Sequence, residues 1–406
     1  MRTNIKKLRD DFPIFHTKPD WAYLDTAATA QVPQVVIDAV AEFQCAYRSS
    51  IHRGLYREAL RATEVYEQAR GTVASFLNAE SAEEVVFTYG ATSSSNMLIA
   101  MLEHSGLFTE GDELVTTVTE HHSSLVPQSM LAQRLGLTMS CIPMKHSLLL
   151  DYEYARSVIT QRTKLVSVML ASNVTGTIHN VRRIARMAHA VGALVACDAT
   201  AAAGHLSIDV RALEVDFLYF SGHKMGSPMG IGALYGKREL LRDLEPGWYG
   251  GGMVEEVACT GARWTDGPQR FEAGTPNIAG AIGLATAVRY LAEHNMVAIR
   301  QYIEALLARA VEELRGIDGV QLFTAAPHLN VGIVSFVVEG VHAHDLAEIA
   351  AREGVALRAG HHCAMPLHEA LGVSATVRAS FFLYNTKHDV DALVAAVKKA
   401  KRIFEA

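Results

Sequence analysis

Short apolar runs alternate with amphipathic segments through the middle of the chain, from about residue 85 to residue 243. The continuous apolar runs predict strands, at 85–89, 113–118, 137–143, 164–171, 193–198, 215–220 and 231–235. Apolar residues at helical spacing predict helices between them, at 92–104, 124–135, 152–160, 180–191 and 237–243. Continuous apolar strands separated by amphipathic helices are typical of a parallel sheet covered on both faces. The pattern therefore predicts an α/β fold with a mainly parallel, seven-stranded sheet.

The flanking segments predict an N-terminal arm and a second domain. Before the sheet we expect an arm with a short helix, a strand and two helices, at 1–20, 21–25, 33–47 and 58–77. Residues 245–276, which are rich in glycine and proline, predict a long loop. After it we expect helices at 278–294, 297–315 and 388–403 and strands near 331–338, 355–358 and 376–383. The predicted division is an arm (1–20), a large domain (21–295) and a smaller α+β C-terminal domain (296–406), against which the N-terminal segment can pack.

Composition and charge exclude several classes of protein. The formal net charge of −6 argues against a nucleic-acid or anionic-membrane partner. The N-terminus is charged and no apolar segment follows it, which argues against a signal peptide, and no run of about eighteen apolar residues predicts a membrane span. The five cysteines are scattered without C-x-x-C spacing. This is typical of free thiols in a reducing cytoplasm, with no disulfide framework and no metal site.

Two predicted strands end on opposite charges. The run Ala193–Asp198 delivers one carboxylate, and the run that begins at Asp216 delivers Lys224 after a Ser-Gly turn. Ligands of open α/β sheets bind at the carboxyl ends of strands. A lysine that attaches the cofactor and an acid that pairs with its ring nitrogen are the two groups that pyridoxal 5′-phosphate (PLP) requires. Alone, either residue could be an ordinary surface lysine or a helix N-cap; together they favour a PLP site.

Other polar residues follow the remaining strands. Thr92 opens a helix after a glycine turn, and helix N-termini bind anions, so Thr92, Ser221 and His223 could grip one phosphate; Thr92 could equally be a plain N-cap. His121 could stack on a pyridine ring or move a proton, or only pack in a loop. Asn173 offers an amide to a carboxylate or ring hydroxyl, although asparagine is also a common turn residue.

The C-terminal segment supplies a candidate nucleophile and a candidate carboxylate clamp. Cys363 follows Gly-His-His, and we expect a mobile, imidazole-rich loop that favours its thiolate. A buried apolar cysteine is the alternative. Arg378 lies on a predicted strand and is suited to a bidentate bond with an α-carboxylate, although a plain ion pair would also explain it.

The order of these motifs resembles the group II cysteine desulfurases of the SufS/CsdA type. The resemblance runs from about residue 10 to the C-terminus. The motifs that carry it are Tyr23-Leu-Asp-Thr-Ala-Ala-Thr29, His52-Arg-Gly54, Glu120-His-His122, Ser172-Asn-Val-Thr-Gly176, Ser221-Gly-His-Lys224, Phe271-Glu-Ala-Gly-Thr-Pro-Asn277, Arg358-x-Gly-His-His-Cys363 and Arg378-Ala-Ser380. These enzymes are class V aminotransferase-like PLP enzymes of fold type I.

The resemblance implies a role for each candidate. Lys224 would hold PLP, Asp198 would pair with its ring nitrogen and His121 would stack on the ring. The phosphate would be bound by Thr92, Ser221 and His223, with Thr275 from the partner subunit of a homodimer. Arg378 and Asn173, together with His52 and Arg358, would bind L-cysteine. Cys363 would take the sulfur as a persulfide and pass it to an acceptor, a SufE-like protein or a thiol, for iron–sulfur cluster or thio-metabolite synthesis.

The chain departs from the family pattern close to the expected cofactor. The usual Asp-Gly-Ala-Gln is Asp198-Ala-Thr-Ala201, so the glutamine expected on the ring hydroxyl is absent. Further departures lie at Ala91, Ser93, Ser123, Ser124, Gly226 and Met229. One lost neutral hydrogen bond costs only about 1 kcal/mol, so PLP should still bind. The departures leave open a selenocysteine lyase, a cystine C–S lyase, an epimerase or a non-catalytic paralogue.

Overall fold

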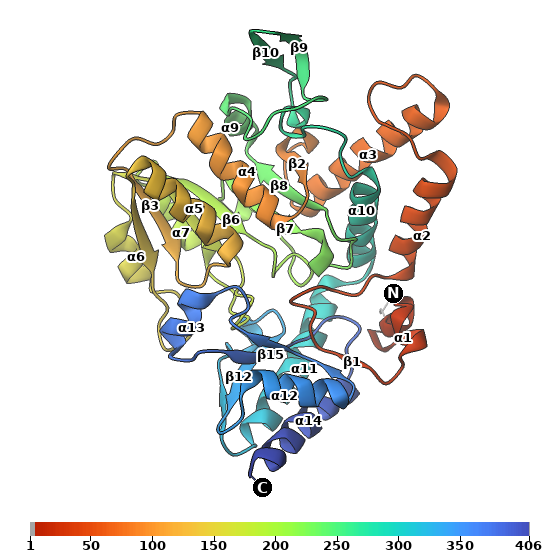
Figure 1. Ribbon diagram of the computed structural model, residues 1–406, viewed down its shortest axis with the longest axis vertical. Helices are drawn as coiled ribbons and strands as arrows, with labels where there is room; N and C mark the ends of the chain where they lie inside the picture. The colour runs from red at the N-terminus through yellow and green to blue at the C-terminus, as the bar shows by residue number, and fades with distance from the viewer. Residues whose placement is uncertain (1–4, 406) are drawn as a thin grey trace.

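The computed structural model describes residues 5–405, which form two regions, each built on its own sheet (Figure 1). The larger sheet has the strand order β2-β8-β7-β6-β5-β3-β4. Its strands are β2 (Val85–Thr88), β3 (Glu113–Thr117), β4 (Thr138–Ile142), β5 (Thr163–Met169), β6 (Leu194–Asp198), β7 (Phe217–Ser221) and β8 (Gly232–Gly236). Strand β8 is antiparallel to both neighbours, and the other pairs are parallel. The predicted seven-stranded, mainly parallel sheet is confirmed.

Helices surround this sheet, and all but the short helix Val210–Leu213 lie where the sequence predicts a helix. They are α2 (Gln34–Glu42), α3 (Arg57–Phe76), α4 (Ala91–His104), α5 (His122–Leu135), α6 (Tyr152–Val158), α7 (Val181–His189), α8 (Val210–Leu213), α9 (Arg238–Asp243) and α10 (Ile278–Glu293). Helix α2 continues as the π-helical turn η2 (Phe43–Tyr47), so the helix predicted up to Tyr47 changes its geometry near its end.

Alternation along β7 shows why the sheet needs helices on both faces. Phe217 and Tyr219 pack in one apolar cluster with residues of α4 and α5. Leu218 and Phe220 pack in the other cluster, with residues of α3 and α7. Successive side chains of a strand point to opposite faces, so an uninterrupted apolar run must be covered twice.

The smaller sheet is antiparallel throughout and has the order β11-β12-β15-β14. Its strands are β11 (Val320–Leu322), β12 (Ile333–Val338), β14 (Arg358–Gly360) and β15 (Thr376–Ser380). Its helices are α11 (Met296–Arg315), α12 (Ala343–Arg352), α13 (Met365–Leu371) and α14 (Lys387–Glu405). The strand predicted at 355–358 is divided, because Val355 and Ala356 form a separate strand, β13, and Arg358 begins β14.

The N-terminal segment lies against the smaller sheet. It contains η1 (Ile5–Asp11), α1 (Ile14–Thr17) and β1 (Ala22–Tyr23), and β1 pairs in parallel with β13. The Arg9 guanidinium donates to the Tyr384 carbonyl oxygen at 3.2 Å, and Asp25 forms an isolated bridge with Ser380. These contacts carry the residues after β1 to the boundary between the two sheets. The domain limits at residues 20 and 295 stay predictions.

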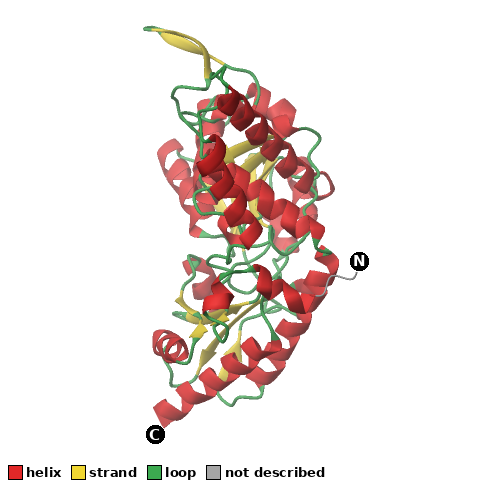
Figure 2. Cartoon of the chain, turned by 90° about the vertical axis from the view of Figure 1, so that its right-hand side faces the viewer, coloured by secondary structure: helices red, strands yellow, loops and turns green. Residues whose placement is uncertain are grey.

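The loop predicted over 245–276 is wrong in one part, because it contains a β-hairpin. Strands β9 (Val254–Ala258) and β10 (Gly261–Trp264) pair antiparallel and project from one end of the molecule (Figure 2). Most of the hairpin's residues are exposed, and an Arg263–Glu255 ion pair of 2.5 Å crosses it. Since neither face is buried within the chain, the hairpin has no apolar alternation that would reveal it.

Within residues 5–405, each helix is too short or too polar to cross a membrane.

Candidate active site

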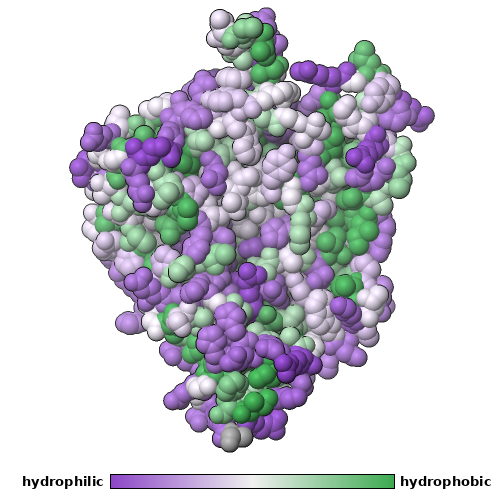
Figure 3. Space-filling model, in the orientation of Figure 1, coloured by the Kyte–Doolittle hydropathy of each residue, from purple (hydrophilic) through white to green (hydrophobic). Residues whose placement is uncertain are grey.

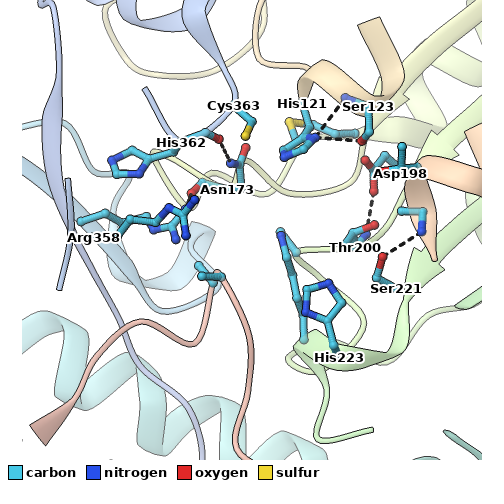
Figure 4. Close-up of a pocket in the computed structure, with 18 residues that line it drawn as sticks. His121, Ser123, Asn173, Asp198, Thr200, Ser221, His223, Arg358, His362 and Cys363 are labelled. Carbon is cyan, nitrogen blue, oxygen red and sulfur yellow. Dashed lines mark hydrogen bonds between the residues drawn. The ribbon is translucent and has the colours of Figure 1, made fainter. Parts of the chain in front are cut away.

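A cavity of about 230 Å³ lies where the two sheets meet, and it brings together most of the predicted site residues (Figure 4). Its walls include Thr92, His121, Asn173, Asp198, Ser221, His223, Lys224, Arg358, Cys363 and Arg378. The region of the large sheet supplies the first seven, and the region of the smaller sheet supplies the last three. Ten residues that the sequence singles out thus line one cavity, and their roles stay predictions.

Strand ends place the charged pair. Strand β6 ends at Asp198, and β7 ends at Ser221, followed by the 3-10 turn η4 (Gly222–Lys224). The two strands are adjacent and parallel, with Asp198 paired in register with Tyr219. Because parallel strands end at the same edge of a sheet, Asp198 and Lys224 lie in the same cavity.

Burial shifts the pKa values of Lys224 and Asp198. Burial and the positive charge of Arg378 lower the pKa of Lys224 to about 8, against an opposing effect of Asp198. Burial raises the pKa of Asp198, although a hydrogen bond from the Thr200 N–H to Asp198 Oδ1 at 2.8 Å opposes this. Within residues 5–405 the Lys224 amine makes no hydrogen bond. A half-buried amine with a lowered pKa and no hydrogen-bond partner among the described residues is a candidate nucleophile and base.

The start of α4 is hydrogen-bonded to the end of β7. The Ala91 N–H donates to Ser221 Oγ at 2.8 Å, and Gly90 before it has φ of 134°, a conformation that glycine alone adopts easily. The N–H groups of Thr92 and Ser93 have no acceptor among the described residues. Free N–H groups at a helix N-terminus, with a hydroxyl beside them, suit a phosphate.

His121 is the N-cap of α5, and its ring faces the cavity (Figure 4). Its Nδ1 accepts the Ser123 N–H at 3.1 Å, so the proton of the neutral ring is on Nε2. Burial and the nearby charge of Lys224 lower the pKa of His121 to about 3. The imidazole is therefore neutral and available for stacking.

Arg378 on β15 is fully buried and held from two sides. One guanidinium nitrogen donates to the Asn173 carbonyl oxygen at 2.9 Å, and the other donates to Asp25 Oδ1 at 3.1 Å. Burial lowers the pKa of Arg378 to about 10, so the side chain stays charged at neutral pH. Its Nε has no partner among the described residues. This is a fixed cation with a free donor, at the cavity wall.

Cys363 is exposed and lies on the short loop between β14 and α13. The sequence predicts a mobile loop. In the structure, hydrogen bonds attach the loop to residues of the large-sheet region: Asn173 Nδ2 donates to the His362 carbonyl oxygen at 2.7 Å, and the His122 N–H donates to the Cys363 carbonyl oxygen at 2.8 Å. The thiol thus reaches the cavity from a loop that is fixed on both sides of it.

Two predicted residues lie elsewhere. His52 and Thr275 line a separate groove of about 340 Å³, with Arg53 and Glu272 among its other residues. His52 Nε2 lies 3.0 Å from Glu67 Oε1. Within one chain, therefore, neither residue contributes to the cavity that contains Lys224.

Sequence reasoning missed several residues of the site. Thr200 lines the cavity with a buried hydroxyl that has no partner among the described residues, and Ser123 orients His121. Glu120 is buried behind the cavity, where it accepts the Met169 N–H at 2.6 Å. Burial and the nearby Asp198 raise the pKa of Glu120 to about 7. The signals in the sequence are the proximity of these residues to His121 and Asp198, the motif that contains Glu120 and the departure from the family pattern at Ser123.

Comparison with known proteins identifies the family. The model of the aminotransferase class-V family matches residues 22–393. A probable cysteine desulfurase of Halobacterium salinarum is 44% identical over 405 residues, covering 99% of this chain and 97% of the relative. A probable cysteine desulfurase of Staphylococcus aureus is 43% identical over 404 residues, covering 99% and 98%.

Solved structures of cysteine desulfurases are also similar to this chain. The cysteine desulfurase CsdA (S-sulfonic acid) of Escherichia coli superposes with a TM-score of 0.93 at 39% identity, over 100% of both chains. The apo cysteine desulfurase of Thermococcus onnurineus superposes with a TM-score of 0.94 at 38% identity, over 99% of both chains. This chain belongs to the aminotransferase class-V family of PLP-dependent enzymes.

Proposed function

We propose that the protein is a PLP-dependent cysteine desulfurase that converts L-cysteine to L-alanine and takes the sulfur onto Cys363 as a persulfide. One observation carries the proposal: the Lys224–Asp198 pair and the Cys363–Arg378 pair line the same cavity. The first pair suits PLP, and the second suits a thiol substrate with a carboxylate. The full-length similarity to cysteine desulfurases supports the same function.

The residues present fit PLP. The free N–H groups at the start of α4 suit its phosphate, the Lys224 amine suits its aldehyde, and Asp198 suits its ring nitrogen. The buried Thr200 hydroxyl, which has no partner among the described residues, offers a further donor at the cavity wall. When bound, PLP supplies an electron sink that allows bonds at the α and β carbons of an amino acid to break.

Residues of the large-sheet region would then transfer protons. Lys224 Nζ, with its lowered pKa, would remove the proton from the substrate Cα and return a proton to the product. His121, held as a neutral ring with Nε2–H, would stack on the cofactor ring and present one donor to the reacting groups.

Residues of the smaller-sheet region, together with Asn173, would bind the substrate and accept its sulfur. Arg378, with Asn173 and Arg358, would bind the carboxylate of L-cysteine. Cys363 Sγ would form a bond with the substrate sulfur while the substrate Cβ–S bond breaks. The exchange balances, since a thiol and L-cysteine give a persulfide and L-alanine. Because Cys363 is exposed, an external acceptor, such as a SufE-like protein or a small thiol, could then collect the sulfur.

A second copy of the chain would complete the site. Thr275 and His52 lie in their own groove, and we propose that they serve the cavity of the partner subunit in a homodimer. Hydrophobic surface lies over α2 (Figure 3), where Val35 and Ile37 are exposed, and Leu55 and Leu60 are exposed at the start of α3. An apolar surface of this kind is suited to a subunit interface.

The test is the product balance. Purified protein loaded with PLP is incubated with L-cysteine and a reductant, and alanine, sulfide and pyruvate are quantified. We expect alanine and sulfide in equal amounts, and neither in a Lys224→Ala variant. Pyruvate in place of alanine would contradict the proposal and indicate β-elimination.

A further inference from the structure

The backbone at Cys363 is strained. His362 and Cys363 have φ of 51° and 58°, so two consecutive residues that are not glycine adopt the left-handed conformation. This conformation is unfavourable for a residue with a Cβ atom, and it persists only where surrounding contacts fix it. The contacts around this loop therefore determine where the thiol lies.

Contacts from the smaller-sheet region fix the residues beside Cys363. His368 Nδ1 lies 3.0 Å from the Ala364 carbonyl oxygen, which only accepts, so Nδ1 carries the proton and Nε2 is an acceptor. The Thr376 hydroxyl, 3.1 Å away, must donate to that Nε2. Its oxygen then accepts from His362 Nε2 at 3.0 Å. One tautomer of each ring thus satisfies all three hydrogen bonds, while His362 Nδ1 has no partner among the described residues.

His122 bonds the loop from the opposite side, through two different groups. Its backbone N–H donates to the Cys363 carbonyl oxygen at 2.8 Å, and its Nε2 accepts the Met365 N–H at 3.1 Å. The two hydrogen bonds lie on the C-terminal side of the strained pair, while the Asn173 amide bonds the His362 carbonyl oxygen at 2.7 Å. Among the described residues, only the His122 side chain bonds the Met365 N–H.

The position of His122 couples this attachment to the cofactor side of the cavity. His122 is the first residue of α5, and the preceding His121 is its N-cap, with its ring in the cavity. A shift of the Cys363 loop would therefore act on the turn that holds His121. Burial and the neighbouring His361 lower the pKa of His122, which keeps Nε2 able to accept.

We propose that His122 is a positioning residue that holds the Cys363 thiol at the cavity by bonding the backbone on its C-terminal side. The inference rests on the proposed sulfur transfer to Cys363. It assigns to His122 no contact with substrate or cofactor. Its side chain acts through one accepted hydrogen bond, which a glutamine could reproduce and an alanine could not.

The experiment compares His122→Ala, His122→Gln and wild-type holoenzyme, with His146→Ala as the control because His146 is exposed in the turn after β4. Hydrogen exchange of the Met365 amide is measured beside kcat and KM for L-cysteine and the PLP content. In His122→Ala we expect Met365 exchange to quicken about five- to tenfold and kcat to fall by a similar factor, which corresponds to one hydrogen bond. KM and PLP content should stay within about twofold of wild type.

Rescue distinguishes positioning from a general loss of structure. His122→Gln should restore slow Met365 exchange and most of kcat. Unchanged exchange and kcat in His122→Ala, or equal losses in the alanine and glutamine variants, would overturn the inference. A wild type that forms no alanine would refute the proposed function, while the Met365 exchange would still decide whether His122 holds the loop.

Discussion

The two walls of the cavity are built in different ways. On the large-sheet wall, Asp198, Ser221 and Lys224 extend from the ends of adjacent strands, and their positions follow from the register of the sheet. On the opposite wall, Arg378 is also fixed by a strand, but Cys363 lies on a loop with positive φ that hydrogen bonds to the large-sheet region hold in place.

This difference separates two requirements of sulfur transfer. Proton chemistry needs a buried amine whose pKa is lowered, and a rigid sheet edge keeps such a group out of water. A sulfur acceptor must reach the substrate and afterwards an external partner, so it has to be exposed. The structure meets both requirements by placing a shielded base on one wall and an exposed thiol on the other.

Removing the base should have the largest effect. In Lys224→Ala we expect alanine formation to fall by at least about 10³-fold, since a positioned acid–base group contributes up to about 10⁴-fold and the attachment point of PLP is also lost. Absorbance spectra and alanine assays measure both losses. Lys398→Ala, which changes an exposed lysine of α14, is the control. Substantial turnover in the Lys224 variant would contradict the role of Lys224 as the base and as the attachment point of PLP.

Changing Arg378, the proposed carboxylate clamp, should have the second-largest effect. Arg378→Lys keeps the charge but loses the planar fork that binds Asp25 and the Asn173 carbonyl oxygen. We expect KM for L-cysteine to rise about 10²-fold, because a buried charged hydrogen bond is worth about 2–5 kcal/mol. Steady-state kinetics measure this, with Arg358→Lys as the comparison. A larger effect at Arg358 would reverse the assignment of the clamp.

The pH dependence of PLP capture should report the lowered pKa of Lys224. Only the neutral amine attacks an aldehyde, so the capture rate of cofactor-free protein should rise about tenfold per pH unit and level off near pH 8. For an exposed lysine, the capture rate would continue to rise up to about pH 10. Stopped-flow absorbance over pH 6–10 distinguishes the two profiles. A rate that still climbs above pH 9 would show that burial does not activate this amine.

Restoring the family's usual glutamine should have the smallest effect. Ala201→Gln adds one neutral hydrogen-bonding group beside the cavity, so we expect kcat/KM for L-cysteine to change by less than about tenfold. Thr200→Ala is the matched variant, because Thr200 is the neighbouring hydroxyl. A much larger rise of kcat/KM in Ala201→Gln would mean that the departures from the family pattern around the cavity select another substrate.

The sequence predicts the walls where local rules decide the position. Asp198 and Lys224 each follow an apolar run, so their place at a strand end is readable from the pattern alone. The pattern assigns no role to Ser123, Thr200, Glu120 or His122, because their roles depend on burial or on hydrogen bonds between segments far apart in the sequence. The left-handed backbone at Cys363 was unpredictable for the same reason.

The hairpin in the segment predicted as a loop, and the positions of His52 and Thr275, also depend on more than local pattern. The β9–β10 hairpin lies in a segment rich in glycine and exposes both of its faces, so no apolar periodicity marks its strands. His52 and Thr275 have the expected motifs, yet a single chain places them in another groove. In the proposed homodimer they would contribute to the cavity of the second subunit, and a pattern within one chain does not describe such a contact.

The most direct test of the account is the mass of the peptide that contains Cys363 after one turnover without reductant. We expect this peptide to gain the mass of one sulfur atom and one alanine to be released per subunit, with no gain on the exposed Cys45, Cys141 or Cys259. Alanine released while Cys363 stays unmodified would contradict it.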